Sequence, residues 1–576
     1  MLSDGEHAIG AHEWYTARVH QWEQKEAVPH ALISPSPILG DPDGEGSQPR
    51  SGIVHLDALD EFSREDKLIL WGRKGTGKTT ILREMARRAN DDYIKGYAFA
   101  AIVPTHGLLL VLSASLRSSS LSSLLADDIT HSARRIWRWV ATVAPVVSYL
   151  RGRDQSQSRR SHAVALLEAY LDDINSRWRY QPISDWIDDT LQDIMQAVLG
   201  RNAEEAAFLA RDVRRAFSEP VVDELRRLFT DCVAHERGRG NRMLVLFDTG
   251  EIYTPQDQSS LALLRALLDE AYSAYTSRGA PGALSIKAAL PSELMPHLLS
   301  DNPGKKLPHY CIIHWSQRSI VELIGRRLAF AVSPTAEESV LERMDELGRR
   351  EVAYRILPEI VHPRQDFPFD TLAYFVRHTL QTPRQAINLM NSILSEAQHR
   401  HGTWQGPLAE TELRGSLHRG LEYVVLDALA MYRSSFSEVE TFVQRVLGER
   451  QSIFLLSDLQ NWLRDVRGIS RGLNMTSDEA ITLLLRMGVI GIASQVSQRD
   501  SGPYSYAVVH SQFQYQVKAQ LTPSSQSVLV THPAFYHFLR SAVDTGSFVY
   551  PEPAENVSWE RVEEEDRETR SLGGMR

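Results

Sequence analysis

Glycines, lysines and threonines are concentrated in a short stretch that follows an apolar run at residues 68–71. In chain order the stretch consists of Gly72, Arg73, Lys74, Gly75, Thr76, Gly77, Lys78, Thr79 and Thr80. Glycine permits backbone angles that are closed to other residues, so several main-chain N–H groups can point at one anion. The G-x-x-x-x-G-K-T spacing therefore predicts a phosphate-binding loop, in which Lys78 contacts the β- and γ-phosphates of a nucleotide and Thr79 binds Mg²⁺.

A loop of this kind needs a strand before it and a helix after it. Residues 68–71 are apolar and are expected to form a short buried strand. Ile81, Leu82 and Met85 recur on one face of a helix expected at residues 80–88. A helix that begins near Lys78 would add free N–H groups and the positive end of its dipole to an anion site. Both elements favour a nucleotide-binding loop over the alternative, a glycine-rich turn without a ligand.

A second candidate group follows an apolar run at residues 243–247, which ends in Asp248. Such a run is typical of a buried parallel strand whose carboxyl end delivers a carboxylate. Because the run lies downstream of the phosphate loop, we expect Asp248 and Thr79 to bind Mg²⁺ together. The alternative is a solvated strand end without a metal. Glu251 is the nearest carboxylate that could orient an attacking water.

Composition restricts the class of protein. The chain has 576 residues, which predicts three or four domains, and its net charge of −10 argues against general nucleic-acid binding. Its two cysteines, Cys232 and Cys311, lie far apart and are expected to be buried thiols in a reducing compartment. No apolar run is long enough for a membrane span and the start lacks a signal peptide, so we expect a cytoplasmic protein.

Further apolar runs predict a parallel sheet. Strands are expected at residues 97–103, 283–290 and 309–314, and they alternate with helical patterns. This alternation predicts an α/β fold of the doubly wound type. In chain order we expect an N-terminal helical segment at 1–33, a linker at 34–52, a core at 53–315 with a helical insertion at about 115–240, a helical lid at 316–400, a winged-helix-like domain at 401–550 and a disordered acidic tail at 551–576.

The expected insertion consists of four amphipathic helical segments and carries a group of basic residues. These are Arg134, Arg135, Arg138, Arg151, Arg153, Arg159 and Arg160. One interpretation is a solvated basic face, which charged helices commonly present. The other is a surface that senses a polyanion or an acidic partner.

The winged-helix expectation comes from residues 476–510. Thr476 and Glu479 form a capping box before a helix at residues 480–485, and Gly488 ends that helix. A strand is expected at 489–493, a loop at 494–503 and a returning strand at 504–510.

Taken together, these segments resemble the bacterial P-loop ATPases of the STAND/AAA+ group over roughly residues 53–540. The resemblance is carried by the loop at 72–79, the segments 246–251 and 286–290, a helix that opens at Trp315 and ends at Arg326 and Arg327, the turn Thr382-Pro383-Arg384, and the segment 532–535. It implies an ASCE-type P-loop NTPase fold with a helical lid and a C-terminal winged helix. It also implies ATP and Mg²⁺ as cofactors.

The resemblance assigns further roles. Arg384 would be the lid arginine that reaches the γ-phosphate, and Arg326 or Arg327 could act as an arginine finger on the nucleotide of a neighbouring subunit. For each arginine, the alternative is an ordinary surface residue. Ser292 is the candidate polar residue at the end of the strand after Asp248, although Pro291 departs from the family pattern.

One departure concerns the acids after Asp248. Many relatives place two acids three and four positions on, where this chain has Glu251 and Ile252. A single carboxylate predicts slow hydrolysis, which suits a switch whose ATP and ADP states differ in domain arrangement.

Three functions are consistent with these observations. The first is a slow regulatory ATPase of a bacterial anti-phage defence or stress-signalling system, which forms a homo-oligomer or controls a protein effector encoded nearby. The second is a DNA-handling ATPase, of the loader or transposition type, that grips duplex with the winged helix. The expected recognition helix begins with two acids and is mostly apolar, so it argues against this function. The third is a non-catalytic scaffold that holds ADP.

Overall fold

The computed structural model describes residues 57–551 with internal gaps. The gaps are at residues 92, 118–128, 153–161, 200–217, 238–241, 250–256, 278–283, 299–306, 333–352, 365–366, 402–406, 434–435, 467–474, 502–503, 517–520 and 543–546. The chain divides into two compact units. The sheet unit consists of His55–His314 with Leu429–Val439, and the C-terminal unit includes Trp315–Ala428 and the part after Glu440. The expected segments at 1–33 and 34–52 and the tail beyond residue 551 lie outside the described residues.

The sheet unit contains one five-stranded parallel sheet. Its strands are β1 (Ile69–Gly72), β2 (Tyr97–Pro104), β3 (Arg242–Asp248), β4 (Leu284–Pro291) and β5 (Tyr310–Ile312). Their order across the sheet is β2-β3-β4-β1-β5, and every pairing is parallel. The predicted parallel α/β sheet is therefore confirmed. Because the strands are parallel, all five carboxyl ends lie at one edge, where ligands bind in open α/β sheets.

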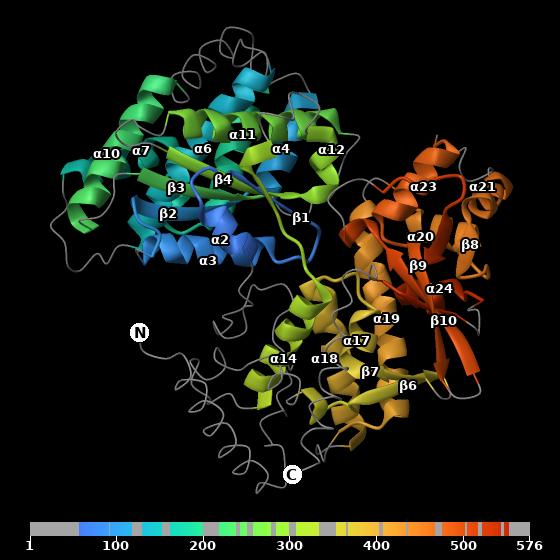
Figure 1. Ribbon diagram of the computed structural model, residues 1–576. Helices are drawn as coiled ribbons and strands as arrows, with labels where there is room; N and C mark the ends of the chain where they lie inside the picture. Colours follow the sequence, from blue (N-terminus) through green and yellow to red (C-terminus); the bar gives the residue numbers. More distant parts are fainter. Residues whose placement is uncertain are drawn as a thin grey trace, which may run out of the picture. The chain divides into compact units, whose positions relative to one another are not determined.

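Helices cover both faces of this sheet (Figure 1). On one face lie α2 (Asp57–Ser63) and α3 (Lys78–Asn90), and on the other α4 (His106–Arg117), α6 (Ile129–Gly152) and α11 (Gln258–Thr276). In α3, Ile81, Leu82 and Met85 are buried, which confirms the predicted apolar face. The strands are buried on both sides because helices cover them, as their continuous apolar runs predict. The remaining short helices of the unit are η3 (Ser176–Arg179), η4 (Ser292–Leu294), α12 (Met295–Leu298) and η5 (Leu307–His309).

The helical insertion is present between β2 and β3. After α4 and α6 come α7 (His162–Asn175), α8 (Ile183–Leu199) and α10 (Glu219–Arg237). The inner face of α6 is built into the core of the unit. Trp137 donates from Nε1 to the carbonyl of Leu263 at 2.9 Å, and its ring lies 5.3 Å from that of Phe247 in β3.

Three of the insertion's arginines have structural partners. Arg138 Nε lies 2.7 Å from a carboxylate oxygen of Glu270 in α11, and Arg134 Nε lies 3.5 Å from the other oxygen. The side chain of Glu270 is only 3% exposed. Arg151 donates to the carbonyl of Trp178. At Arg134 and Arg138 these contacts argue against the interpretation as a polyanion-sensing surface, because a buried carboxylate needs compensating charge. Arg153, Arg159 and Arg160 lie outside the described residues.

Asp188 in α8 packs closely against the first turn of α4. A Cβ atom at Gly107 would lie 1.8 Å from Asp188 Oδ2, so glycine is needed for this approach. Burial raises the pKa of the Asp188 carboxyl to about 7, and the charges of Asp185 and Asp189 contribute to the same shift.

Lys287 is a buried lysine in β4 that ties three segments together. Its Nζ donates to the carbonyl oxygens of Phe62, Arg64 and Lys67, each at 2.6 Å. Burial lowers the pKa of Lys287 to about 7, whereas the three acceptors favour the ammonium, because only the protonated amine has three N–H bonds to donate. The lysine thus holds the end of α2, and the turn that leads into β1, against β4.

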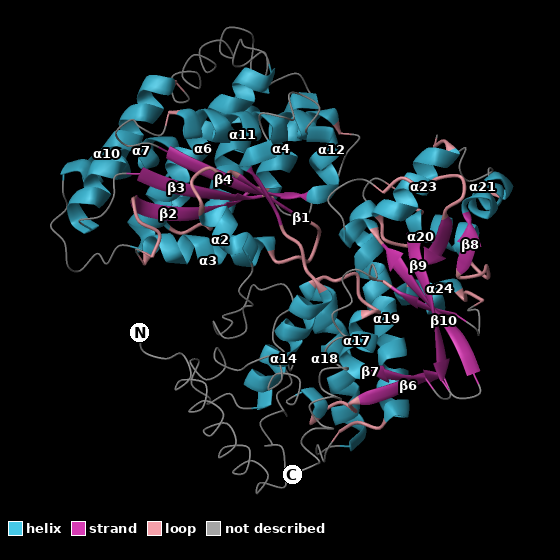
Figure 2. Cartoon of the chain, in the orientation of Figure 1, coloured by secondary structure: helices cyan, strands magenta, loops and turns pink. Residues whose placement is uncertain are grey.

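The C-terminal unit begins with helices and a two-stranded sheet, β6-β7, and ends in a second five-stranded sheet (Figure 2). The elements up to residue 447 are α14 (Gln317–Val332), β6 (Ile360–Arg364), β7 (Phe367–Asp370), α17 (Thr371–Val376), α18 (Pro383–His401), α19 (Glu410–Arg433) and α20 (Val439–Leu447). The later helices are α21 (Leu456–Asp465), α23 (Ser477–Arg486), η6 (Gln514–Gln516), η7 (Pro533–Phe535) and α24 (Tyr536–Leu539). The sheet contains β8 (Ile453–Leu455), β9 (Ile490–Ser501), β10 (Tyr504–Gln512), β11 (Val528–Thr531) and β12 (Ser547–Tyr550).

Local signals in this unit are largely confirmed. Thr476 and Glu479 form the predicted capping box of α23, and Gly488 follows the helix with a φ of 72°. Thr382 caps α18, whose first residue is Pro383. The loop predicted at residues 494–503 is wrong, because β9 continues to Ser501 and pairs with β10 from Tyr504 onward. Backbone hydrogen bonds hold the two strands together even where their side chains are polar. The polar sequence therefore did not indicate how far the strands extend.

The structure also bears on membrane association. None of the described helices combines the length and apolar content that crossing a bilayer requires.

Candidate functional site

The glycine-rich loop lies between β1 and α3, at the carboxyl edge of the sheet. The flanking strand and helix are those expected from the sequence. Gly75 and Gly77 have φ angles of 76° and 87°, in the left-handed region that disfavours other residues. Thr76 Oγ1 donates to the carbonyl of Arg73 at 2.8 Å and braces the turn. The result is a tight turn that leads directly into the amino end of α3, the geometry that an anion site requires.

Lys78 is the first residue of α3, and its side chain folds back along the loop. Its Nζ donates to the carbonyl oxygens of Gly72 at 2.9 Å and Arg73 at 3.0 Å. The residue is buried, with 7% exposure. These contacts hold a positive charge at the loop, where it can compensate a phosphate.

Thr79 and Asp248 are in direct contact. Thr79 Oγ1 donates to Asp248 Oδ2 at 2.6 Å, although the two residues are 169 positions apart in sequence. Asp248 ends β3, and Thr79 lies in the first turn of α3. A hydroxyl and a carboxylate are oxygen donors of the kind that Mg²⁺ prefers, and such sites use one or two protein ligands beside phosphate and water. This donor pair therefore fits a magnesium ion that accompanies a nucleotide.

The position directly after Asp248 has a structural role. Thr249 is 2% exposed, and its hydroxyl donates to the carbonyl of Ala289 in β4 at 2.8 Å. The Thr249 hydroxyl thus links the end of β3 to β4, and this position supplies no carboxylate. Glu251, the predicted water-orienting carboxylate, lies outside the described residues, as does Ile252.

The end of β4 lies beside the loop, because Pro291 pairs with Gly72 in the parallel register. Ser292 follows, and its hydroxyl donates to Glu293 Oε2 at 3.4 Å. The other oxygen of Glu293 lies 3.7 Å from Arg73 Nε, and the Glu293 side chain is 6% exposed. The structure therefore adds a buried carboxylate next to the phosphate loop. Sequence reasoning named Ser292 and missed Glu293, whose only signal was its place directly after a strand adjoining β1.

The remaining candidates belong to the C-terminal unit. Arg384, in the first turn of α18, lies 3.8 Å from the carboxylate of Asp427 in α19, and both side chains are mostly buried. Gln385 donates to the same carboxylate at 3.1 Å. In α14, Arg326 pairs with Glu322 at 2.8 Å, and Arg327 is half-buried. The structure thus brings the loop and Asp248 together in the sheet unit, and Ser292 follows the residue that pairs with Gly72. Arg326, Arg327 and Arg384 belong to the C-terminal unit.

Comparisons with known proteins add no further assignment. Neither a scan of protein-family models nor a search of curated proteins finds a match to this chain. Among the residues that the structure describes, no group of three or more His, Cys, Asp or Glu side chains could hold a metal ion by itself.

Proposed function

We propose that the protein is an ATP-binding regulatory ATPase. The observation that carries this proposal is the 2.6 Å contact between Thr79 and Asp248 at a glycine loop that also holds Lys78. Two segments from distant parts of the chain thus converge on one point at the carboxyl edge of the sheet. The strand order, with β4 between β1 and β3, supports the ASCE type of P-loop fold.

Each residue has a distinct part in the proposed activity. The loop from Gly72 to Thr80 would enclose the phosphates, and Lys78 would compensate their charge. Thr79 and Asp248 would hold Mg²⁺, which neutralises charge on the phosphates when it is bound. Glu251 would orient the attacking water, and Ser292 would contact the nucleotide from the end of β4.

Slow turnover is part of the proposal. Thr249 is neutral and its hydroxyl bonds β4, and Ile252 stands where many relatives have a second acid. Residues 249–252 therefore contain one acid, Glu251. Slow hydrolysis suits a switch, in which bound ATP and ADP favour different conformations. Arg384 would sense the γ-phosphate, and Arg327 would complete the site of a neighbouring subunit in a homo-oligomer.

The biological setting rests on the resemblance to STAND/AAA+ ATPases. We infer a bacterial defence or stress-signalling system in which this chain controls a separate effector protein. The C-terminal unit would contain the winged helix, with α21, α23 and the β9–β10 hairpin as its parts. On α23, Asp478 and Glu479 are exposed, while Ala480, Ile481, Leu484 and Leu485 are buried. This helix supports protein contacts more than insertion into a DNA groove, which needs basic or amide side chains.

The central experiment measures nucleotide binding and phosphate release by the full chain. Lys78→Ala is expected to abolish binding of a fluorescent ATP analogue. Asp248→Asn should retain binding without magnesium and lose at least 100-fold in turnover with it. Lys95→Ala, which changes an exposed lysine of the same unit, is the matched control.

Four results would redirect the proposal or one of its parts. Equal binding by wild type and Lys78→Ala would contradict the assignment of the loop. Co-purified ADP without turnover would favour a non-catalytic scaffold. Salt-dependent binding of duplex DNA would favour the DNA-handling alternative. If wild type and Arg327→Ala remain monomeric with ATP, the arginine-finger role must be dropped.

A further inference from the structure

The carboxyl end of β3, which carries Asp248, is held from both neighbouring strands. On the side of β2, Thr105 donates twice to the carbonyl oxygen of Asp248, from its N–H at 2.9 Å and from its hydroxyl at 3.1 Å. On the side of β4, the Thr249 hydroxyl donates to the carbonyl of Ala289 at 2.8 Å. The Asp248 side chain accepts from Thr79 between these two attachments. Thr105 therefore fixes the backbone of the candidate metal ligand on the β2 side.

Thr105 is also the residue that joins β2 to α4. It is completely buried, with 0% exposure, although its side chain is polar. Its carbonyl accepts from the N–H of Leu109 at 2.9 Å and so begins the hydrogen bonding of α4. Burial of a hydroxyl is costly unless the hydroxyl is hydrogen-bonded, so the bond to the Asp248 carbonyl is maintained when α4 shifts. The position of Asp248 is thus linked to that of the first turn of α4.

The first turn of α4 touches helix α8 of the insertion. A Cβ atom at Gly107 would lie 1.8 Å from Asp188 Oδ2 and 2.8 Å from Asp188 Cγ. Gly107 lies within α4, two positions after Thr105, and the two helices pack against each other. Glycine is therefore present at this position to give α8 room.

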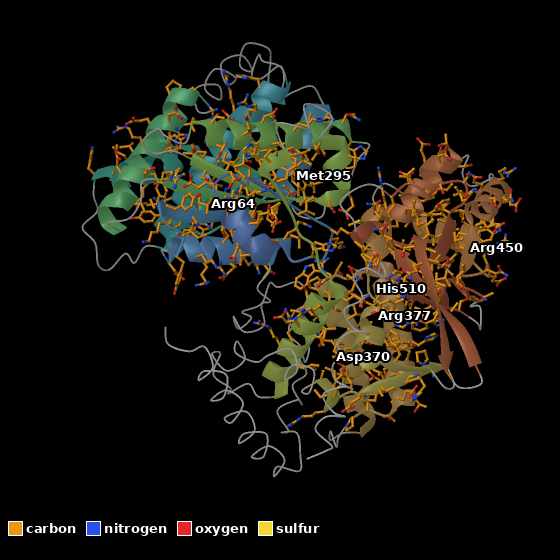
Figure 3. All side chains as sticks on the ribbon, in the orientation of Figure 1. Arg64, Met295, Asp370, Arg377, Arg450 and His510 are labelled. Atoms are coloured by element: carbon orange, nitrogen blue, oxygen red, sulfur yellow. The ribbon has the colours of Figure 1, made fainter. Side chains whose placement is uncertain are left out.

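Helix α8 is anchored to the other helices of the insertion. Trp186 donates from Nε1 to the carbonyl of Asn175 in α7 at 2.9 Å, and its ring stacks on that of Trp139 in α6, with the ring centres 6.3 Å apart. The Asn175 amide donates to the Thr190 hydroxyl at 3.1 Å. Figure 3 shows the side chains that fill the space between the sheet and the helices that cover it. Because close-packed interiors transmit displacements, a shift of α8 reaches α4.

We propose that Thr105 is a positioning residue for Asp248, and that helix α8 of the insertion sets the position of Thr105 through Gly107. This inference rests on the proposed function, in which Asp248 binds Mg²⁺ beside the nucleotide. Residues that hold a metal ligand in place change the affinity for the metal without touching it. A shift of α8 moves the start of α4, then Thr105, and with it the Asp248 carboxylate. The insertion is thus a control element of the site, and every contact in this series lies within the sheet unit.

Replacement of Thr105 tests the positioning role. Thr105→Val keeps the shape of the side chain and removes its hydroxyl bond to Asp248. Affinity for a fluorescent ATP analogue is measured in the full chain with and without Mg²⁺. The gain in affinity from Mg²⁺ should fall by about three- to tenfold, whereas affinity without Mg²⁺ should change by less than about twofold. Thr105→Ser retains the hydroxyl and should keep the gain of wild type.

A matched control is available in the same unit. Thr142 is also completely buried, and its hydroxyl donates to the carbonyl of Arg138 within α6 at 3.0 Å. Thr142→Val therefore loses a comparable hydrogen bond away from Asp248, and its gain from Mg²⁺ should equal that of wild type. An equal fall in Thr142→Val and Thr105→Val would assign the effect to general destabilisation and overturn the positioning role.

A methyl group at Gly107 tests the coupling to α8. Alanine is the better helix former, so Gly107→Ala does not weaken α4 itself, yet its Cβ meets Asp188. The gain in affinity from Mg²⁺ should fall as in Thr105→Val. Asp188→Ala removes the carboxylate that the methyl group meets, so the Gly107→Ala/Asp188→Ala double variant should recover the gain of Asp188→Ala alone. This double-mutant cycle isolates the contact between α4 and α8.

Hydrogen exchange without nucleotide or Mg²⁺ gives an independent measurement. The peptide that covers residues 243–248 should exchange faster in Gly107→Ala than in wild type, because the end of β3 has lost part of its attachment. The double variant should exchange at the rate of Asp188→Ala. Equal exchange in Gly107→Ala and wild type would overturn the coupling, whatever the nucleotide data show.

The outcomes separate this inference from the proposed function. If wild type gains affinity from Mg²⁺ and Thr105→Val keeps that gain, the positioning role is overturned and the ATPase proposal stands. If Gly107→Ala loses the same gain with and without the Asp188 carboxylate, the control by α8 is overturned while the role of Thr105 stands. If wild type binds no nucleotide, the proposed function fails and the positioning role fails with it.

Discussion

Replacement of Lys287 by methionine tests how the strand that carries the phosphate loop is positioned. Methionine keeps the length of the side chain and removes the ammonium, which leaves the carbonyls of Phe62, Arg64 and Lys67 without this donor. A hydrogen bond to a charged group contributes about 1.5–3 kcal/mol, and burial of the ammonium costs several kcal/mol. Lys287→Met loses three hydrogen bonds but also removes the cost of burying the ammonium. The difference predicts that the free energy of unfolding of the sheet unit falls by about 2–4 kcal/mol.

Hydrogen exchange measures this loss without requiring the whole chain to unfold in one step. Peptides that cover β1 and β4 report the opening free energy of the sheet unit, because slow-exchanging core amides open with the global transition. Lys95→Met is the matched control, since Lys95 is an exposed lysine of the same unit. A change below about 0.5 kcal/mol in Lys287→Met, the range of ordinary surface substitutions, would refute the reasoning. It would mean that desolvation cancels the three hydrogen bonds.

Three further predictions concern groups in the same unit. The pKa of Asp188 is raised to about 7 in the folded state, so folding takes up a proton and stability falls as the pH rises toward 7. Asp188→Asn should therefore raise the melting temperature more at pH 8 than at pH 4.5. Thr249→Val should cost about 1–2 kcal/mol of stability by loss of its hydroxyl bond, whereas Thr249→Ser should cost less, by thermal unfolding. Glu293→Gln should weaken nucleotide binding several-fold through Arg73 while leaving the melting temperature within a few degrees, by titration calorimetry. An unchanged nucleotide affinity in Glu293→Gln would show that the Arg73–Glu293 ion pair does not position the phosphate loop.

The sequence predicted the parts of the site that are contiguous. The loop at 72–80 is recognisable because glycine spacing, a strand and a helix fall within one short stretch. Asp248 is recognisable because it ends an apolar run. The direct contact between Asp248 and Thr79 is an observation of the structure, since it depends on the order of strands in the sheet.

Contacts between distant positions were not predictable in the same way. Lys287 is more than 200 positions from its acceptors, and within β4 it is the one charged residue of a mostly apolar run. Asp427 and Arg384 are on separate helices, so their pairing has no local signal. The arginines of α6 read as a solvated or sensing face because Glu270, their buried partner, belongs to an element more than 100 positions later.

The attachment of α6 limits how this chain can be divided by an engineer. Trp137 is bonded to α11 and packs on Phe247 of β3, and Glu270 is enclosed by Arg134 and Arg138. Removal of α6 would therefore remove the packing of Trp137 on Phe247. It would also leave the Glu270 carboxylate without the charges of Arg134 and Arg138. Chimeras that exchange α6 without α11 should fold poorly. An exchange within this unit therefore has to keep α6, β3 and α11 together, although the sequence presents a core with a separate insertion.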